Sequence, residues 1–523
     1  MEKIKKHGIS CLVKLFFCYI LYGLMFNEFL VNKQDGIWNG TYFNAGNWEL
    51  SLGRWAIRYW DKLHYGISVH PFSSVVTLVF FIFGTCLLID LFNIKAGSLM
   101  DYLISGLFLS NIVVCVSLSY LFTSGIYGLS FFLSILCIWC IKKVSSAVSS
   151  KKVNYKTILT LVIAICSVVL MLGLYQAYLG CIALVGCAYL IFIILNREEK
   201  IVLKSYVVTS TVTAILGGVL YERVLNEELL KYNVRLDSYK GANSLSLINI
   251  FSKIAPSLKY SYKNFLNYFT KNGYRWNLND GKLILICLFV VICAVLLYSY
   301  AKHSGILEII FSMVLFFAMP FCVNIVAILV PNSGTSERQT APLALVFPVI
   351  IALSIGLIEK NEEKLIDKIM TGIALTISAV MIWGSAYQTI IDQEAMHQGS
   401  IAVKTISNSV ISELEDMELY SANREYAIIG SLRHNNLIYL NELYYMSNSY
   451  AAVAGSYWSG NLDSWTWRGI FHNMSGINLK MCNDGEYVKL LTNLEVQEMP
   501  VYPEKGFIRE IEGIVVIKLS SNQ

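Results

Sequence analysis

Long, uninterrupted apolar runs recur along most of the chain, and they constrain its fold more than any other feature. Each is close to the length of about 20 residues that a helix needs to cross the hydrocarbon core of a bilayer. Only 15% of the 523 residues are charged and 55% are apolar, whereas an average soluble domain carries about 25% charged residues. This composition excludes a soluble enzyme, a disordered scaffold and a nucleic-acid-binding protein.

We predict an α-helical polytopic membrane protein with about eleven transmembrane helices, because only helices and closed barrels satisfy their backbone groups in lipid. Lysines before the first run resemble the start of a signal peptide, but the run is too long and lacks a cleavage site, so we expect a retained helix. The predicted spans are 9–31, 71–93, 103–122, 125–141, 157–174, 177–195, 202–221, 283–300, 306–330, 342–358 and 369–388.

The distribution of Lys and Arg predicts the orientation of these spans. Most basic residues of the short loops fall on the side of the N-terminus, which the positive-inside rule assigns to the cytoplasm. An odd number of spans then places residues 389–523 outside the cell. The transmembrane domain is therefore expected to cover residues 1–388, with long outer loops at 32–70 and 222–282.

The C-terminal segment 389–523 is no longer membrane-like. It contains a polar amphipathic stretch at 393–417 and two strand-like runs, Tyr426–Gly430 and Gly513–Leu519. Apolar, β-branched runs of this length are typical of buried strands. We expect a small extracytoplasmic α/β domain.

The loop 32–70 concentrates acidic, basic and aromatic side chains, among them Asp35, Glu49, Arg54 and Trp38. Asp35 follows the first span by only a few residues, where partial desolvation can tune the basicity of a carboxylate. The alternative is a solvated acid that begins a turn with Gly36. The tryptophans suit sugar stacking, but they also suit an aromatic belt at the membrane interface.

The triplet Gly53-Arg54-Trp55, after one span and an acidic loop, resembles the bacterial Gtr type II glucosyltransferases. Three further segments resemble parts of this family: the loop 331–342, the end of the last span at 383–397, and the C-terminal ending 500–519. The family often has paired acids near the position of Asp35, whereas here Gln34 precedes a single Asp.

The resemblance implies a glycosyltransferase of the GT-C architecture in the bacterial inner membrane. Such an enzyme takes a single sugar, here glucose, from a polyprenyl-phosphate carrier and adds it to a cell-surface polysaccharide such as O-antigen or a wall glycan. A cognate flippase and a carrier-charging glycosyltransferase are the expected partners, besides the lipid bilayer. One in-line displacement would invert the anomeric centre.

The chemistry needs a base and a cationic partner for the departing lipid phosphate. We predict Asp35 as the catalytic base, with Glu49 as the reserve. Arg54 and Arg338 suit the phosphate because a guanidinium grips its oxygens in bidentate fashion, and Trp38 and Trp55 complete the predicted substrate site. No metal or other cofactor is expected, because a single phosphate needs no diphosphate clamp and the histidines lack metal-ligand spacing.

Two further segments each allow two interpretations. Residues 257–271 form a basic amphipathic stretch, which suits either a connector on the membrane surface or a lid over the carrier lipid. The polar and aromatic residues of 461–475 suit either packing or recognition of the acceptor glycan.

Two other functions remain open at this point. A flippase or transporter of lipid-linked sugars would place ionisable residues and broken helices at mid-membrane. A polymerase or ligase would also act outside on lipid-linked glycans, but it would move a whole chain.

Overall fold

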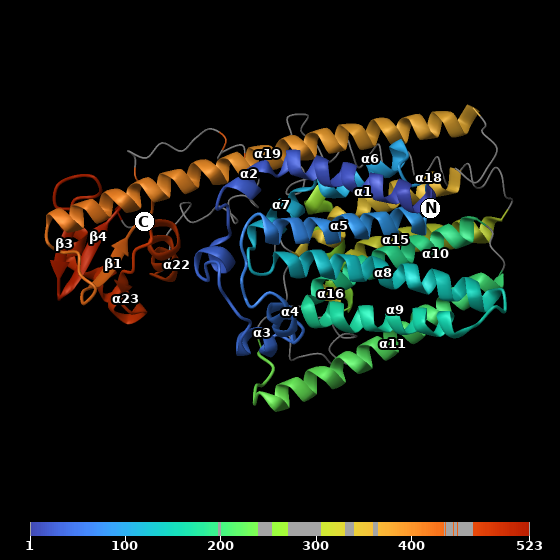
Figure 1. The fold of residues 1–523 in the computed structure, drawn as a ribbon, viewed down its shortest axis with the longest axis horizontal. Coiled ribbons are helices and arrows are strands. Elements are labelled where there is room, and N and C mark those ends of the chain that lie inside the picture. The colour runs from blue at the N-terminus through green and yellow to red at the C-terminus, as the bar shows by residue number, and fades with distance from the viewer. Residues whose placement is uncertain are drawn as a thin grey trace.

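The computed structural model describes residues 2–196, 200–238, 254–269, 305–329, 339–358, 365–432, 435, 443, 447 and 464–521. Of the residues in these ranges, 74% are helical. The long apolar helices run side by side in one bundle (Figure 1), as in a membrane protein. The bundle is built from α1 (Glu2–Leu21), α5 (Phe72–Leu91), α6 (Leu99–Leu109), α7 (Ile112–Ser119), α8 (Ser124–Ser149), α9 (Tyr155–Leu174), α10 (Leu179–Leu195), α11 (Lys200–Lys231), α15 (Ile306–Val323), α18 (Val346–Ile358) and α19 (Leu365–Asp416).

Seven helices of the described ranges are long and apolar enough to cross a membrane, or up to eight if the bent pair α6–α7 is one span. Two further apolar helices, His7–Leu21 and Ala341–Leu357, are shorter. The predicted span 283–300 lies outside the described residues. The helices thus occur where the apolar runs predict them, although eleven spans remain a prediction.

The first predicted span is wrong in its extent. The helix ends at Leu21, and a short helix α2 (Gly23–Asn27) follows after Tyr22. The predicted span 103–122 is likewise interrupted, because α6 and α7 meet at an angle of 53°.

Neighbouring side chains satisfy the backbone where α6 and α7 separate. The hydroxyl of Tyr22 donates to the carbonyl oxygen of Leu109 at 2.7 Å, and the hydroxyl of Thr389 donates to that of Ser110 at 3.0 Å. The side chain of Asn111 accepts from the N–H of Val113 and caps α7. The break is stable because partners from α19 and the end of α1 replace the lost helical hydrogen bonds.

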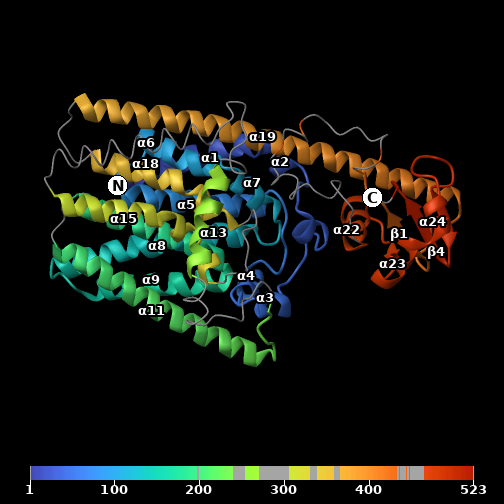
Figure 2. The same ribbon diagram turned by 180° about the vertical axis from the view of Figure 1, so that it is seen from behind.

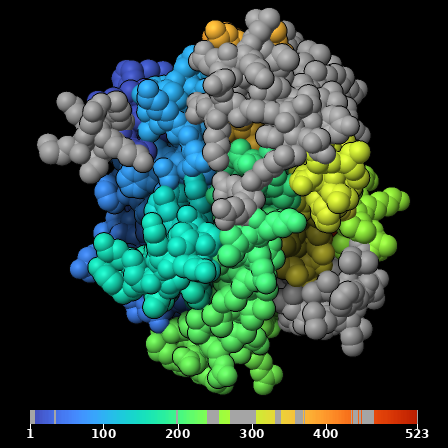
Figure 3. All heavy atoms as spheres, turned by 90° about the vertical axis from the view of Figure 1, so that its right-hand side faces the viewer, coloured from blue at the N-terminus to red at the C-terminus, as the bar shows by residue number. Residues whose placement is uncertain are grey.

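The predicted span 369–388 and the amphipathic stretch 393–417 form one helix, α19, rather than two elements. No proline interrupts this segment. The helix extends beyond the bundle and carries the C-terminal sheet at its far end (Figure 1). We call this end of the bundle the sheet end. Figure 3 views the opposite end, where the teal segment joining α8 to α9 lies beside the green α11.

The C-terminal segment contains a four-stranded sheet in the order β2-β1-β4-β3. Strand β1 (Glu425–Ile429) is parallel to β2 (Lys480–Met481) and β4 (Ile514–Lys518), and β3 (Ile508–Ile511) is antiparallel to β4. Both predicted strands are confirmed, since β1 and β4 coincide with the two apolar runs. The sheet packs with α22 (Ser464–Gly469), η8 (Ile470–Met474), α23 (Asp484–Thr492) and α24 (Leu494–Glu498).

The amphipathic stretch 257–271 is described up to residue 269, as α13 (Ile254–Asn267) and the residues after it. Figure 2 shows α13 lying across the bundle instead of along it. Its inner face bonds through Ser261 and Asn264 to Asn324, while Leu258 and Tyr262 remain exposed. This geometry supports the interpretation as a surface connector.

A buried ion pair in the bundle gives a test of this packing. Nζ of Lys14 on α1 lies 2.6 Å from Oδ1 of Asp101 on α6, and both side chains are almost fully buried. We expect Lys14→Met to lower the free energy of unfolding by about 3–5 kcal/mol, because it strands a buried carboxylate. Thermal unfolding in detergent measures the effect. The double variant Lys14→Met/Asp101→Asn should be more stable than Lys14→Met, because it leaves no unpaired buried carboxylate. If the double variant is equally or less stable, the unpaired carboxylate is not the cause of the loss.

Candidate functional site

The first loop folds against the sheet end of the bundle as short helices. These are η1 (Lys33–Ile37), α3 (Asn47–Ser51) and α4 (Ile57–Leu63). Figures 1 and 2 show α3 and α4 at this end, on the side of the C-terminal sheet. The loop is thus an ordered cap on the helices.

Asp35 is buried and connects this loop to the start of α8. Its carboxylate accepts hydrogen bonds from the backbone N–H groups of Phe122 and Thr123, each at 3.0 Å, and from the hydroxyl of Thr123. Helix α8 begins at the next residue, Ser124. A negative charge is favoured there because the helix dipole and unpaired N–H groups point toward it.

Glu49, the reserve base, has a local structural role. Its side chain accepts from the N–H of Gly46, the N-cap residue of α3, at 2.7 Å. It is half-buried. This contact anchors the carboxylate to its own helix.

Asp61 is a third acid of the loop, and the sequence analysis assigned it no role. Its side chain is 1% exposed. Oδ2 accepts from the N–H of Ala45 at 2.7 Å, whereas Oδ1 has no hydrogen bond within the described ranges. Burial raises the pKa of Asp61 to about 7, and the charges of Glu49 and Asp35 add to the increase, against the Ala45 hydrogen bond.

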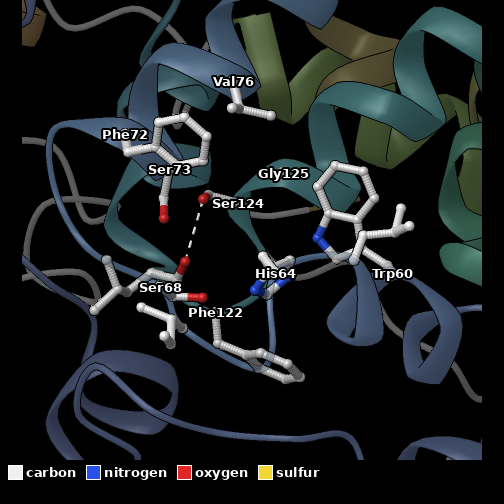
Figure 4. Close-up of a pocket in the computed structure, with 12 residues that line it drawn as sticks. Trp60, His64, Ser68, Phe72, Ser73, Val76, Phe122, Ser124 and Gly125 are labelled. Carbon is white, nitrogen blue, oxygen red and sulfur yellow. Dashed lines mark hydrogen bonds between the residues drawn. The ribbon is translucent and has the colours of Figure 1, made fainter.

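A cavity of about 200 Å³ opens between the loop and the starts of α5 and α8 (Figure 4). Neither Asp35 nor Asp61 lines it, but both contact residues that do: Asp35 accepts from the N–H of Phe122, and Asp61 lies 3.7 Å from Nε2 of His64. The lining is mostly apolar and aromatic, with three hydroxyl groups. Its residues are Trp60, Leu63, His64, Ile67, Ser68, Phe72, Ser73, Val76, Leu121, Phe122, Ser124 and Gly125.

The Gly53-Arg54-Trp55 triplet adopts a tight turn against α9 and α11. Gly53 has φ +78°, and a Cβ there would lie 2.6 Å from the hydroxyl oxygen of Tyr221. The guanidinium of Arg54 stacks on the ring of Tyr175, 4.7 Å from its centroid, and its Nε has no hydrogen bond in the part of the chain described. Arg54 therefore keeps donor capacity for an anion.

The two predicted sugar-stacking tryptophans are held differently. Trp55 is only 8% exposed, and its ring packs so closely on Gly173 that a Cβ there would come within 2.7 Å. Trp38 is 39% exposed and donates from Nε1 to the hydroxyl of Thr466 on α22 at 2.8 Å. Trp55 is thus a packing residue, and Trp38 joins the loop to the C-terminal segment.

Arg338 lies outside the described residues, so its place relative to the cavity stays a prediction. In the segment 461–475, Trp467 is buried while Trp465 is 59% exposed, with Arg468 stacked 5.6 Å from its ring centre. Among the described residues, no group of three or more His, Cys, Asp and Glu side chains could hold a metal ion.

Comparison with known proteins identifies the family. The family model of glucosyl transferase GtrII matches residues 30–355, which is more than half of the chain and includes the whole first loop. The matches noted at 383–397 and 500–519 lie beyond this range. No curated protein and no solved structure matches the chain significantly.

The pKa of Asp61 predicts a pH-dependent stability. Because burial raises this pKa from 3.8 to about 7, the folded protein binds a proton that the unfolded chain lacks between these values, so wild-type stability falls as the pH rises through this window. Asp61→Asn should raise Tm at pH 8 and change it little at pH 5. Asp416→Asn, on an exposed acid of α19, is the matched control and should show no such difference. An equal effect of Asp61→Asn at both pH values would refute the pKa increase.

Proposed function

The chain belongs to the GtrII glucosyl transferase family, and we propose that it moves a single glucose from a polyprenyl-phosphate carrier to a cell-surface polysaccharide on the outer face of the bacterial inner membrane. The observation that carries this proposal is the cavity between the first loop and the bundle, whose lining residues Phe122 and His64 contact the buried acids Asp35 and Asp61. The mouth of the cavity suits the lipid part of the donor, and its interior suits the sugar part.

The mouth of the cavity suits a lipid-linked donor. Three of its lining residues are large, apolar and exposed: Leu63 at 77%, Ile67 at 52% and Phe72 at 65%. Exposed apolar clusters of this kind mark membrane or ligand contacts. They would face lipid at the bilayer surface, where a polyprenyl tail can reach the cavity from the membrane.

The inside of the cavity suits one sugar ring. Trp60 and Phe122 offer aromatic faces, and Ser68, Ser73 and Ser124 offer hydroxyl groups (Figure 4). Its 200 Å³ is smaller than the roughly 300–1,000 Å³ of pockets for drug-sized ligands. This size suits a single sugar ring.

In the proposed reaction, an acceptor hydroxyl oxygen bonds to the anomeric carbon while the carbon–oxygen bond to the phosphate breaks. The bonding electron pair leaves with the phosphate, and the anomeric centre inverts. Arg54, and Arg338 by prediction, would bind the anionic leaving group. This chemistry needs no metal ion.

The hydrogen bonds of Asp35 favour an electrostatic role over proton removal, which the sequence analysis assigned to it. Three donors hold its charge in place. A fixed negative charge beside the cavity would stabilise the positive charge that develops on the sugar in an oxocarbenium-like transition state. Glu49 would then act through its charge and its capping contact.

One observation favours the transporter alternative. The bent helix pair α6–α7 resembles the broken helices at which transporters bind their substrates. A flippase would move the sugar lipid across vesicles that contain no acceptor, whereas the proposed enzyme would move only the sugar, and only when acceptor is present.

The proposal predicts transfer by the purified protein. In lipid nanodiscs, label should move from polyprenyl-phosphate glucose to a cell-envelope glycan. Asp35→Asn should lower kcat about 10²-fold or more, because a preorganised charge is lost. Thr123→Val removes one of the three donors but keeps the charge, so it should lower Tm and retain most transfer. If Thr123→Val abolishes transfer like Asp35→Asn, the role of Asp35 is structural.

A second substitution tests the phosphate contact. Arg54→Gln should lower kcat/KM for the lipid donor about tenfold or more, because a charged hydrogen bond to the leaving group is lost. Arg235→Gln, which removes an exposed arginine just after α11, is the control and should transfer normally. Equal kinetics of Arg54→Gln and wild type would exclude Arg54 from the phosphate site.

A further inference from the structure

His64 is the only titratable side chain among the twelve residues that line the cavity. It lies directly after the last residue of α4, as its C-cap. Figure 4 shows its imidazole between Trp60 and Phe122, and the ring meets that of Trp60 edge-on at 5.8 Å. A substrate in the cavity would therefore contact this imidazole.

The imidazole is paired with the buried acid of the same helix. Nε2 of His64 lies 3.7 Å from Oδ1 of Asp61. That oxygen is the one without a hydrogen bond in the described chain, and Nδ1 of His64 also has none. Contacts between catalytic groups are often long in a free enzyme and tighten with substrate.

Among the charged or titratable side chains described around Asp61, His64 is the one that can form an ion pair with it. The other charges that influence the carboxylate are those of Glu49 on α3 and Asp35 on η1, and both are negative. On α4 itself, Arg58 bonds to Gly46 and Asn47, and Lys62 is exposed. Protonation of His64 would thus place a positive charge beside Asp61.

We propose that His64 is the general base of the transfer, and that Asp61 is its positioning residue. This inference rests on the proposed function. As the acceptor oxygen bonds to the anomeric carbon, its proton moves to the imidazole of His64. The Asp61 carboxylate stabilises the resulting imidazolium through Nε2–H, as the aspartate does in a catalytic triad.

The pair predicts the direction of the pH dependence. The pKa of Asp61 is about 7, so the carboxylate is charged above this pH and able to stabilise the imidazolium. Below it, Asp61 is neutral and can no longer stabilise the imidazolium. Transfer should therefore fall as the pH drops below about 7.

Transfer by His64→Ala with and without added imidazole tests the base directly. We expect kcat/KM to fall about 10²-fold or more, in the range of general-base catalysis, and free imidazole to restore at least part of it. Lys62→Gln changes an exposed residue of the same helix and is the matched control, with wild-type kinetics expected. Wild-type kinetics of His64→Ala, or a loss that imidazole does not restore in a folded variant, would overturn the proposal.

Asp61→Asn tests the positioning role, with His64 still present. We expect a loss of about tenfold or more and a pH profile displaced to lower pH, because the imidazole loses the charge that favours its protonation. A lower rate with an unmoved pH profile would mean that Asp61 is merely structural.

The pairing has a readout that does not depend on transfer. In wild-type protein with isotopically labelled histidine, the NMR titration midpoint of His64 should lie at higher pH than in Asp61→Asn. Equal midpoints would overturn the pair. If wild type transfers no sugar while the midpoints differ, the proposed function fails and the pair stands.

Discussion

The contact on which the start of the first loop depends is that between the Asp35 carboxylate and the N-terminal end of α8. The donors at residues 122 and 123 lie far along the chain from Asp35, and α8 itself packs between α5 and α9. A helix N-terminus has N–H groups that need acceptors, and a buried carboxylate needs donors. Each therefore satisfies the other, and the contact fixes the loop over the bundle.

This contact also explains why two buried acids beside one cavity differ in chemistry. Asp35 meets three donors, whereas Asp61 meets one N–H and the charges of two other acids. The donors in the first environment favour the charged form of Asp35, and the second environment raises the pKa of Asp61 to about 7. Separate environments of this kind allow neighbouring acids to take different roles in one reaction.

The sequence predicts the helices well because apolar length is a local property, and β1 and β4 are readable from their β-branched residues. The end of α1 and the bend between α6 and α7 depend on hydrogen bonds from Tyr22 and Thr389, which no local pattern contains. Asp35 could be placed near the membrane from its position after the first span, but its donors could not be predicted. The spacing of Asp61 and His64 on one helical face is visible in the sequence, whereas the burial of Asp61 depends on how residues 45–49 fold over it.

The proposed transfer requires the sugar to occupy the cavity beside His64. A cryo-EM structure of the protein in nanodiscs with a non-reacting polyprenyl phosphonate sugar would locate it. We expect the sugar ring between Trp60 and Phe122, with the lipid tail leaving past Phe72. A sugar bound elsewhere in the bundle, with this cavity empty, would contradict this expectation.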